Sequence, residues 1–166
     1  GALAPKEACK GGVAARKVFM EKFVIQGGPP LSGEIVAAGN KNAALPILAA
    51  CLLTDEEVVL TNVPRIRDTE TQIAVLEAIG VRAEWAAENE LWLRADSVAS
   101  TTPDEALSAR IRASFLLAGP LLARFGEARM PPPGGDFIGR RRLDPHLDAF
   151  RDMGARVEGD REILIA

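Results

Sequence analysis

One order of predicted elements (helix, strand, helix, hairpin) occurs twice in the sequence, and this repeat constrains the fold more than any other feature. Leu52–Leu53 corresponds to Leu121–Leu122, and Ile79–Gly80 corresponds to Met153–Gly154, at a spacing of roughly 70 residues. The two copies share almost no polar residues, so what repeats is architecture. Each unit is expected to pack its helices against a small sheet, which predicts an α/β (α+β) fold with the long apolar helices inside.

The predicted elements divide the chain into a leader, an N-terminal pair of strands and two repeat units, at residues 1–19, 20–38, 39–98 and 99–166. The two N-terminal strands, at 22–26 and 33–39, are expected to be joined by a Gly-Gly-Pro-Pro turn. The leader has charged and small residues without the apolar centre of a secretory signal. We therefore expect it to be a disordered or artificial extension.

Each repeat unit is expected to contain a helix, a strand, a second helix and a hairpin. In the first unit these elements are expected at 42–53, 57–63, 69–79, 81–85 and 90–95. In the second unit they are expected at 105–124, 126–130, 145–153, 155–159 and 162–166. The second helix of each unit should begin after an aspartate cap, Asp68 or Asp144, and end at a glycine, Gly80 or Gly154.

The charge and composition of the chain argue against several function classes. A net charge of −3 lacks the basic excess typical of nucleic-acid-binding proteins. No apolar run approaches the ~20 residues that a membrane-spanning helix needs, so no membrane association is expected. Two cysteines and one histidine do not form a metal motif, and Cys51 is expected to be a buried thiol in an apolar helix. The cytoplasm is the expected location.

The segment PPPGGDFIGRRRLDPH, residues 131–146, combines a turn with charged side chains. A surface turn explains its glycines and Asp136, but not the arginines Arg140, Arg141 and Arg142 that follow. Guanidinium groups bind phosphate, so an anion site is the alternative. An exposed aspartate has a pKa near about 3.9, and only desolvation or a neighbouring anion would make Asp136 a proton donor at neutral pH. The residues alone leave Asp136 as a turn residue and Asp144 as a helix cap.

Lys41 and Asn42 stand at the start of the first apolar helix. A lysine at a helix N-terminus suits a phosphate or a carboxylate, because the free N–H groups and the ammonium attract anions. A solvated lysine that follows an Asn40 cap explains the same pattern. Arg112 lies in an apolar segment, and a single arginine there is typical of a surface residue.

Four segments taken together resemble one known family. They are KFVIQGG…LSGEIVAAGNKNAALPILAACLL, NVPRIRDTET, IRASFLLAGPLLARFGEA and PPGGDFIGRRRLDPHL, in that order. From about residue 20 to residue 166 the chain is similar to the N-terminal part of the UDP-N-acetylglucosamine enolpyruvyl transferases (1-carboxyvinyltransferases). The related shikimate-pathway transferase fits these motifs less well. The resemblance implies an inside-out α/β barrel built from βαβαββ repeats, with about two repeats of the first domain in this chain and the second domain absent.

The resemblance also implies a reaction and its site. The enolpyruvyl group of phosphoenolpyruvate would be transferred to the 3′-hydroxyl of UDP-N-acetylglucosamine, with release of phosphate, at the start of peptidoglycan synthesis. No metal and no organic cofactor are implied. The residues implied to bind phosphoenolpyruvate are Lys41, Asn42 and Arg141. Those implied to bind UDP-N-acetylglucosamine are Arg112, Arg141, Arg142, Leu143, Asp144 and Pro145.

By the same resemblance, Asp136 occupies the position of the proton donor, which is a cysteine alkylated by fosfomycin in most of the family. An aspartate there implies resistance to fosfomycin. The alternative is a truncated module of the same family that is catalytically incompetent and binds the sugar nucleotide weakly at most. A missing third repeat would leave an unpaired edge through which chains could self-associate. A scaffold that reuses the fold is a third reading. It is disfavoured by the joint presence of Lys41, Asn42, Arg112, Asp136 and Arg141.

Overall fold

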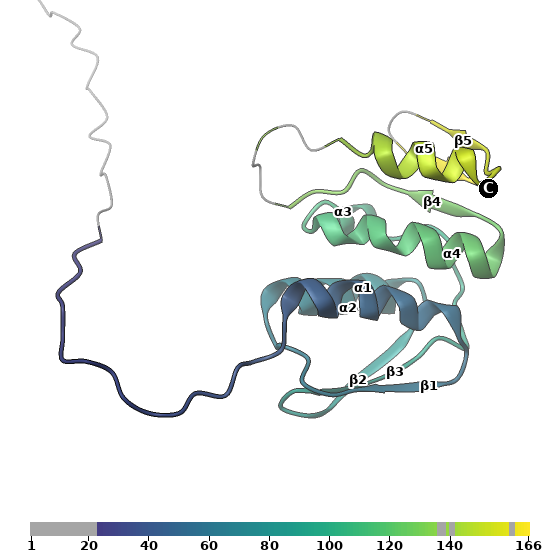
Figure 1. Cartoon of the computed structure of the whole chain (residues 1–166). Coiled ribbons are helices and arrows are strands. Elements are labelled where there is room, and N and C mark those ends of the chain that lie inside the picture. The colour runs from purple at the N-terminus through teal and green to yellow at the C-terminus, as the bar shows by residue number, and fades with distance from the viewer. Residues whose placement is uncertain (1–22, 136–138, 140–141, 160–161) are drawn as a thin grey trace, which may run out of the picture. The chain divides into compact units, whose positions relative to one another are not determined.

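The computed structural model of the chain describes residues 23–135, 139, 142–159 and 162–166 (Figure 1). The chain divides into two units, residues 1–35 and residues 36–166. The described part of the first unit, 23–35, contains no helix and no strand. The predicted leader, 1–19, lies outside the described residues.

The N-terminal strands expected at 22–26 and 33–39 are wrong for the described residues of both segments. A strand is stabilised by hydrogen bonds to a neighbouring strand and by packing of one of its faces. None of the described strands pairs with residues 23–39. The side chains of Phe23, Val24 and Ile25 are more than four-fifths exposed, so the apolar pattern of the segment has no packing partner in the described residues of its unit.

Within the described part of the chain, the helices and strands all belong to the second unit. Its first half contains α1 (Lys41–Ala50), the 3-10 helix η1 (Cys51–Leu53), β1 (Glu57–Leu60), α2 (Arg67–Ala78), β2 (Arg82–Ala87) and β3 (Glu90–Arg94). Its second half contains α3 (Glu105–Ser108), the 3-10 helix η2 (Arg112–Leu117), α4 (Ala118–Phe125), β4 (Ala128–Met130), α5 (Asp144–Asp152), β5 (Val157–Glu158) and β6 (Ile163–Ile165).

The two halves contain sheets of the same topology. The strand orders are β1-β3-β2 and β4-β6-β5, and every pair of neighbouring strands is antiparallel. In each half a helix, α2 or α5, separates the first strand from the hairpin. Figure 1 shows α1 and α2 on one face of the β1-β3-β2 sheet, with α4 on the far side of these helices. The predicted α/β fold class and the two hairpins are therefore confirmed.

The core follows from the alternation of side chains along the strands. Leu91 and Leu93 of β3 are fully buried, and Val58 and Ala83 pack beside Leu93 in the neighbouring strands. Burying a leucine side chain contributes about 1.5–3 kcal/mol. The helices supply the other half of the core through fully buried leucines at positions 48, 52, 76, 117 and 121.

Helix α1 buries only one face. Asn40 is its N-cap, since the Asn40 side chain accepts a hydrogen bond from the backbone N–H of Ala43 at 3.1 Å. Ala44, Leu45, Leu48 and Ala49 are buried, as the helical period requires. Ile47 is about half exposed (47%), so the apolar helix that was expected to lie inside is buried on one face only.

The long helix expected at 105–124 is broken into α3, η2 and α4. Ile111 has an extended backbone (φ −144°, ψ 133°), and the hydroxyl of the buried Ser114 donates to its carbonyl at 2.9 Å. Pro120 lacks an N–H group and lies in the first turn of α4, where no hydrogen bond is lost. The break turns the apolar run into a corner that borders the candidate site.

Arg124 links the two halves of the unit. Its Nη1 donates to the carbonyl oxygens of Leu52, Thr54 and Ala95 at 2.9, 3.0 and 2.8 Å. Leu52 lies in η1, and Thr54 and Ala95 directly follow η1 and β3, all in the first half, whereas Arg124 belongs to α4 of the second. The link therefore fixes how α4 lies against η1 and the end of β3.

Among the described residues, no helix has both the length and the apolar character to cross a bilayer.

Candidate functional site

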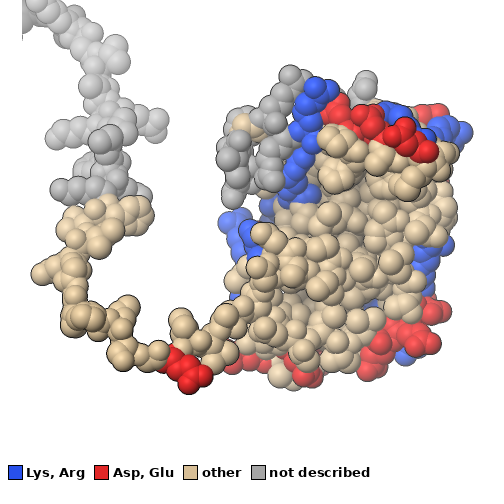
Figure 2. All heavy atoms as spheres, viewed as in Figure 1, with Lys and Arg blue, Asp and Glu red and all other residues tan. Residues whose placement is uncertain are grey.

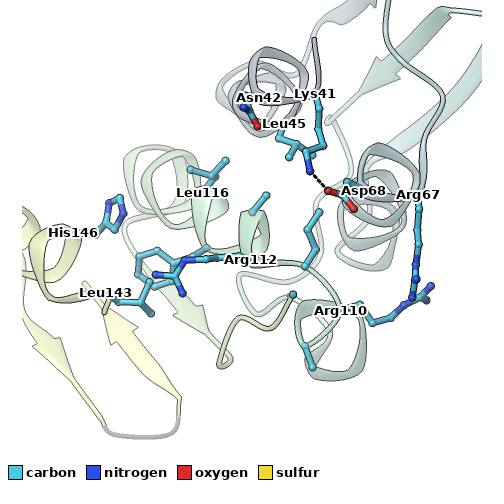
Figure 3. Close-up of a pocket in the computed structure, with 15 residues that line it drawn as sticks. Lys41, Asn42, Leu45, Arg67, Asp68, Arg110, Arg112, Leu116, Leu143 and His146 are labelled. Carbon is cyan, nitrogen blue, oxygen red and sulfur yellow. Dashed lines mark hydrogen bonds and ion pairs between the residues drawn. The ribbon is translucent and has the colours of Figure 1, made fainter. Parts of the chain in front are cut away.

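A cleft of about 550 Å³ opens where the first turns of α1 and α2 meet the broken segment between α3 and η2. Figure 3 shows its side chains, which come from both halves of the unit. Figure 2 shows basic side chains gathered along the left edge of the molecule, the edge at which α1 begins in Figure 1. Of the described residues that line the cleft, those with ionised side chains are Lys41, Arg67, Asp68, Arg110 and Arg112. Four cations against one carboxylate among these residues make the cleft suited to an anion.

Lys41 and Asn42 are the first two residues of α1, and both line the cleft. The ammonium of Lys41 contacts Oδ2 of Asp68 at 2.6 Å. The N-cap role of Asn40 leaves the side chain of Asn42 at the cleft wall rather than at the helix cap. The predicted pair therefore lies at the positive end of a helix, where the partial charge attracts anions.

Asp68 does not cap α2, which corrects the sequence prediction. The N-cap is Ile66, and the hydroxyl of Thr69 both accepts from the N–H of Ile66 at 3.2 Å and donates to the carbonyl of Pro64 at 2.6 Å. Thr69 is fully buried, so its hydroxyl makes the hydrogen bonds of the helix N-terminus from the core side. Asp68 is thereby left in the first turn of the helix, and its side chain points into the cleft (Figure 3).

Arg112 lines the cleft and is tied to the start of α5. Its Nη2 donates to the carbonyl of Arg142 at 3.1 Å. Leu143 also lines the cleft, together with the ring pair of Phe115 and His146, whose centroids lie 5.7 Å apart. Leu143 and the two rings therefore lie with one guanidinium in the cleft wall, an arrangement that suits a ring with polar edges.

Arg142 and Asp144 form a separate pair, and neither lines the cleft as it stands. Nε and Nη2 of Arg142 donate to the two carboxylate oxygens of Asp144 at 2.8 and 2.6 Å. This hydrogen bonding raises the pKa of the Arg142 guanidinium above its ordinary value. Asp144 is the first residue of α5 rather than its cap, which is Leu143, so the predicted cap is shifted by one position. Pro145, in the first turn of α5, does not line the cleft either.

Asp136, Arg140 and Arg141 lie outside the described residues. Gly134 and Gly135, which precede Asp136 directly, are held against the α3–η2 corner. The N–H of Gly134 donates to the carbonyl of Ser108 at 3.0 Å, and that of Gly135 donates to the carbonyl of Ala109 at 3.4 Å. Gly135 has a φ of +91°, in the left-handed region that favours glycine. The stem of the predicted loop is thus attached to the segment that carries Arg112.

Gly134→Ala is expected to detach this stem. A Cβ at position 134 would stand 1.6 Å from the carbonyl oxygen of Ala109, so the backbone must move. The Gly134 N–H should then exchange with solvent many times faster, since its hydrogen bond to Ser108 is lost. Hydrogen exchange followed by NMR measures this directly. The matched control is Gly119→Ala, because nothing lies within 4 Å of a Cβ there. Equal protection of the backbone N–H at position 134 in the variant and in wild type would contradict the predicted loss of its hydrogen bond to Ser108.

Several described residues that line the cleft were not predicted as site residues, among them Arg67, Asp68, Arg110, Phe115 and His146. Asp68 was interpreted as a cap because it precedes an apolar helical period. Phe115 lay in the predicted long helix, and the corner that turns it toward the cleft has no signal in its residue types. Of the remaining predicted residues, Lys41, Asn42, Arg112 and Leu143 are brought together by the fold.

Comparison with known proteins identifies the family. The sequence model of EPSP synthase (3-phosphoshikimate 1-carboxyvinyltransferase) matches residues 25–166. A UDP-N-acetylglucosamine 1-carboxyvinyltransferase of Bradyrhizobium diazoefficiens is 56% identical over 136 residues, which are 82% of this chain and 32% of that protein. A protein of the same name from Treponema denticola is 50% identical over 142 residues, 86% of this chain and 33% of that protein. The chain spans about a third of the length of these curated relatives.

Solved structures agree on the fold. The enolpyruvyl transferase NikO from Streptomyces tendae matches with a TM-score of 0.68 at 24% identity, over 84% of this chain and 31% of that one. EPSP synthase from Acinetobacter baumannii matches with a TM-score of 0.60 at 17% identity, over 81% of this chain and 32% of that one. The family match over 25–166 and relatives of 44–56% identity together confirm the resemblance seen in the sequence. The chain belongs to the EPSP synthase family of enolpyruvyl (1-carboxyvinyl) transferases.

Proposed function

We propose that the chain is the N-terminal third of an enzyme that transfers the enolpyruvyl group of phosphoenolpyruvate to the 3′-hydroxyl of UDP-N-acetylglucosamine. The proposal is supported above all by the 56% and 50% identical relatives, which are named for this reaction. The cleft adds chemical support, because Lys41, Asn42 and Arg112 from two halves of the unit converge on a site suited to anions. The product would enter peptidoglycan synthesis in the cytoplasm.

The proposed roles follow the chemistry of the two substrates. Lys41, Asn42 and Arg141 would bind the charged groups of phosphoenolpyruvate. Leu143 and Arg112 would bind the sugar nucleotide, along with Arg141, Arg142, Asp144 and Pro145 from the same segment. The pair of Arg142 with Asp144 supports this role indirectly, since it orders the first turn of α5 beside the cleft.

Asp136 would act as general acid in the first of two steps. A proton would add to the methylene carbon of phosphoenolpyruvate while the sugar hydroxyl oxygen forms a bond to the adjacent carbon and loses its own proton. In the second step that carbon would lose phosphate and the new methyl group would lose a proton, which restores the double bond. Asp136 follows Gly135 directly, and Gly135 lines the cleft. No metal and no organic cofactor take part in this scheme.

The second candidate is a module of the same family that is incompetent by itself. The chain spans about a third of the length of these relatives. Ile47, Leu53 and Leu116 are exposed apolar side chains of the second unit. They would be covered by the remainder of such an enzyme or by a second copy of the chain.

A hybrid enzyme separates the two candidates. In it, the matched 136 residues of the Bradyrhizobium diazoefficiens relative are replaced by the corresponding residues of this chain. Phosphate release is measured with phosphoenolpyruvate and UDP-N-acetylglucosamine, using the hybrid, the 166-residue chain alone, and the chain mixed with the remainder of the relative. Release by the hybrid or the mixture, and none by the chain alone, is expected. A hybrid that folds but releases no phosphate would favour the incompetent module.

Fosfomycin is expected to leave the hybrid active. The drug alkylates a thiolate, and a carboxylate at position 136 is a much weaker nucleophile. Burial raises the pKa of the Cys51 thiol to about 11, so this cysteine stays protonated at neutral pH and is a poor target. Residual phosphate release after incubation with the drug is the measurement. The Asp136→Cys hybrid should be inactivated and gain the mass of one adduct, and inactivation of the unchanged hybrid would contradict the prediction.

A further inference from the structure

The contact between Lys41 and Asp68 is the shortest charged interaction in the cleft. Nζ of Lys41 lies 2.6 Å from Oδ2 of Asp68, and the two side chains are 47% and 40% exposed. The pair joins the first turn of α1 to the first turn of α2 (Figure 3). Asp68 is also the sole carboxylate among the described residues that line the cleft, which include the lysine and three arginines.

Stability does not explain this pair. An ion pair with both side chains this exposed contributes little to folding, because water screens it and two flexible side chains are ordered. Lys41 is moreover the first residue of α1, where a positive charge is opposed by the positive end of the helix dipole. A lysine in this place is electrostatically favourable only with an anion beside it. Asp68, at the N-terminal end of its own helix, is well placed to be that anion.

A lysine side chain has four rotatable bonds, and ordering them opposes the binding of any ligand. If a carboxylate already holds the ammonium inside the cleft, the entropy of ordering the lysine side chain is lost before the ligand binds, so binding itself is opposed less. An ammonium has three donors, and Asp68 uses one of them, so the pair can persist while an anionic ligand is bound.

We propose that Asp68 is a positioning residue for Lys41: it holds the ammonium in the cleft, ready for the phosphate or carboxylate of phosphoenolpyruvate. This inference rests on the proposed function, and it adds a residue that acts through Lys41 without touching the substrate. Asp68→Asn, which keeps the size of the side chain and removes its charge, should therefore weaken the use of phosphoenolpyruvate and spare that of the sugar nucleotide.

The test is steady-state kinetics of the hybrid enzyme. Asp68→Asn is expected to raise the KM for phosphoenolpyruvate about tenfold and to change the KM for UDP-N-acetylglucosamine less than twofold. The matched control is Glu70→Gln in the same first turn, which removes an equal charge from the helix start. Glu70 pairs with Arg65 at 3.5 Å, and neither residue lines the cleft. The control should leave both KM values within twofold of the parent.

A double-mutant cycle shows whether Asp68 acts through Lys41. In a Lys41→Arg background, where the flexible ammonium is gone, Asp68→Asn should change the KM for phosphoenolpyruvate far less than it does with Lys41 present. Equal effects in the two backgrounds, or an unchanged KM in the single variant, would overturn the proposal. A lower KM in Asp68→Asn would also overturn it, because Asp68 would then be competing with the substrate for Lys41.

A binding measurement keeps this test separate from that of the proposed function. Lys41 is the last lysine in the sequence, and the other four lie within residues 1–22, so its NMR signal is readily assigned with lysine labelled at Cε. In the 166-residue chain, inorganic phosphate should shift the Lys41 signal, with a several-fold higher Kd in Asp68→Asn. Equal Kd values would refute the positioning role. A phosphate-dependent shift in a chain whose hybrid has no transferase activity would refute the proposed function and leave the role of Asp68 supported.

Discussion

Asp136→Asn in the hybrid enzyme is expected to lower kcat by roughly 10²–10⁴, the range that a general acid contributes. Asparagine has nearly the same size and can still accept and donate hydrogen bonds, but it has no proton to give to the methylene carbon of phosphoenolpyruvate. Since the substitution removes no positive charge, the KM values of both substrates should change little. Initial rates of phosphate release over a range of each substrate give kcat and KM separately.

Two controls make this result specific. Asp136→Cys restores an acidic group of a different kind and should recover much of the rate, whereas Asn cannot. The second control is Asp148→Asn, a charge change on the exposed face of α5, where Asp148 pairs with Arg151 at 2.8 Å. An unchanged rate in Asp136→Asn would remove the proton-donor assignment, and a loss of equal size in Asp148→Asn would show that folding rather than chemistry had been affected.

The parts of the fold that the sequence predicts well are those fixed by local signals. The hairpin of β2 and β3 was expected from two apolar runs separated by Glu88 and Asn89, and it forms there. Gly80 and Gly154 follow the ends of α2 and α5 with φ values of +106° and +92°, as the left-handed C-terminal position requires. These features depend on a few neighbouring residues, so a single sequence contains the information.

The incorrect predictions concern segments whose structure depends on contacts beyond the local sequence pattern. The segment 105–124 has the apolar content of one helix, but it is broken at Ile111, whose backbone is extended and whose carbonyl accepts a hydrogen bond from the hydroxyl of Ser114. Asp68 has the sequence signature of a cap, and the buried hydroxyl of Thr69 takes that role because it also reaches the carbonyl of Pro64. Residues 23–26 have the β-branched and aromatic residue types of a strand, yet a strand requires a partner that the sequence cannot indicate.

In the candidate site, too, some features follow from the local sequence and others depend on tertiary packing. Lys41 and Asn42 could be placed at a helix start from the sequence, and the family resemblance implied that they bind phosphoenolpyruvate there. Their proximity to Arg112 depends on the packing of α1 against η2, which no motif encodes. Asp68 was missed because its function is set by a partner 27 residues away. Of the four described cations of the cleft, the sequence therefore indicated Lys41 and Arg112, and the structure added Arg67, Arg110 and the carboxylate of Asp68.

Arg124→Met is expected to cause the largest loss of stability. Nη1 of Arg124 donates to three carbonyl oxygens, and methionine replaces the side chain with an apolar one of similar length that has no donor. Hydrogen bonds from a charged donor contribute about 1.5–3 kcal/mol each, but Arg124 is only half-buried and water replaces part of what is lost. A total loss of about 2–3 kcal/mol follows, which corresponds to a fall in Tm of about 10 °C for a domain of this size.

Arg124→Lys separates the hydrogen bonds from general disruption of α4. A single nitrogen serves all three carbonyls, and the lysine ammonium has three donors, so lysine should retain more of the stability than methionine does. Thermal unfolding of the 166-residue chain is followed by circular dichroism, which reports on both halves, and by tryptophan fluorescence. Trp85 and Trp92 both lie in the β1-β3-β2 sheet, so fluorescence reports on the first half alone. If Arg124 links the halves, the two transitions should coincide in wild type and separate in Arg124→Met. Equal Tm values for wild type and Arg124→Met would show that packing of the apolar helices holds the halves together without this arginine.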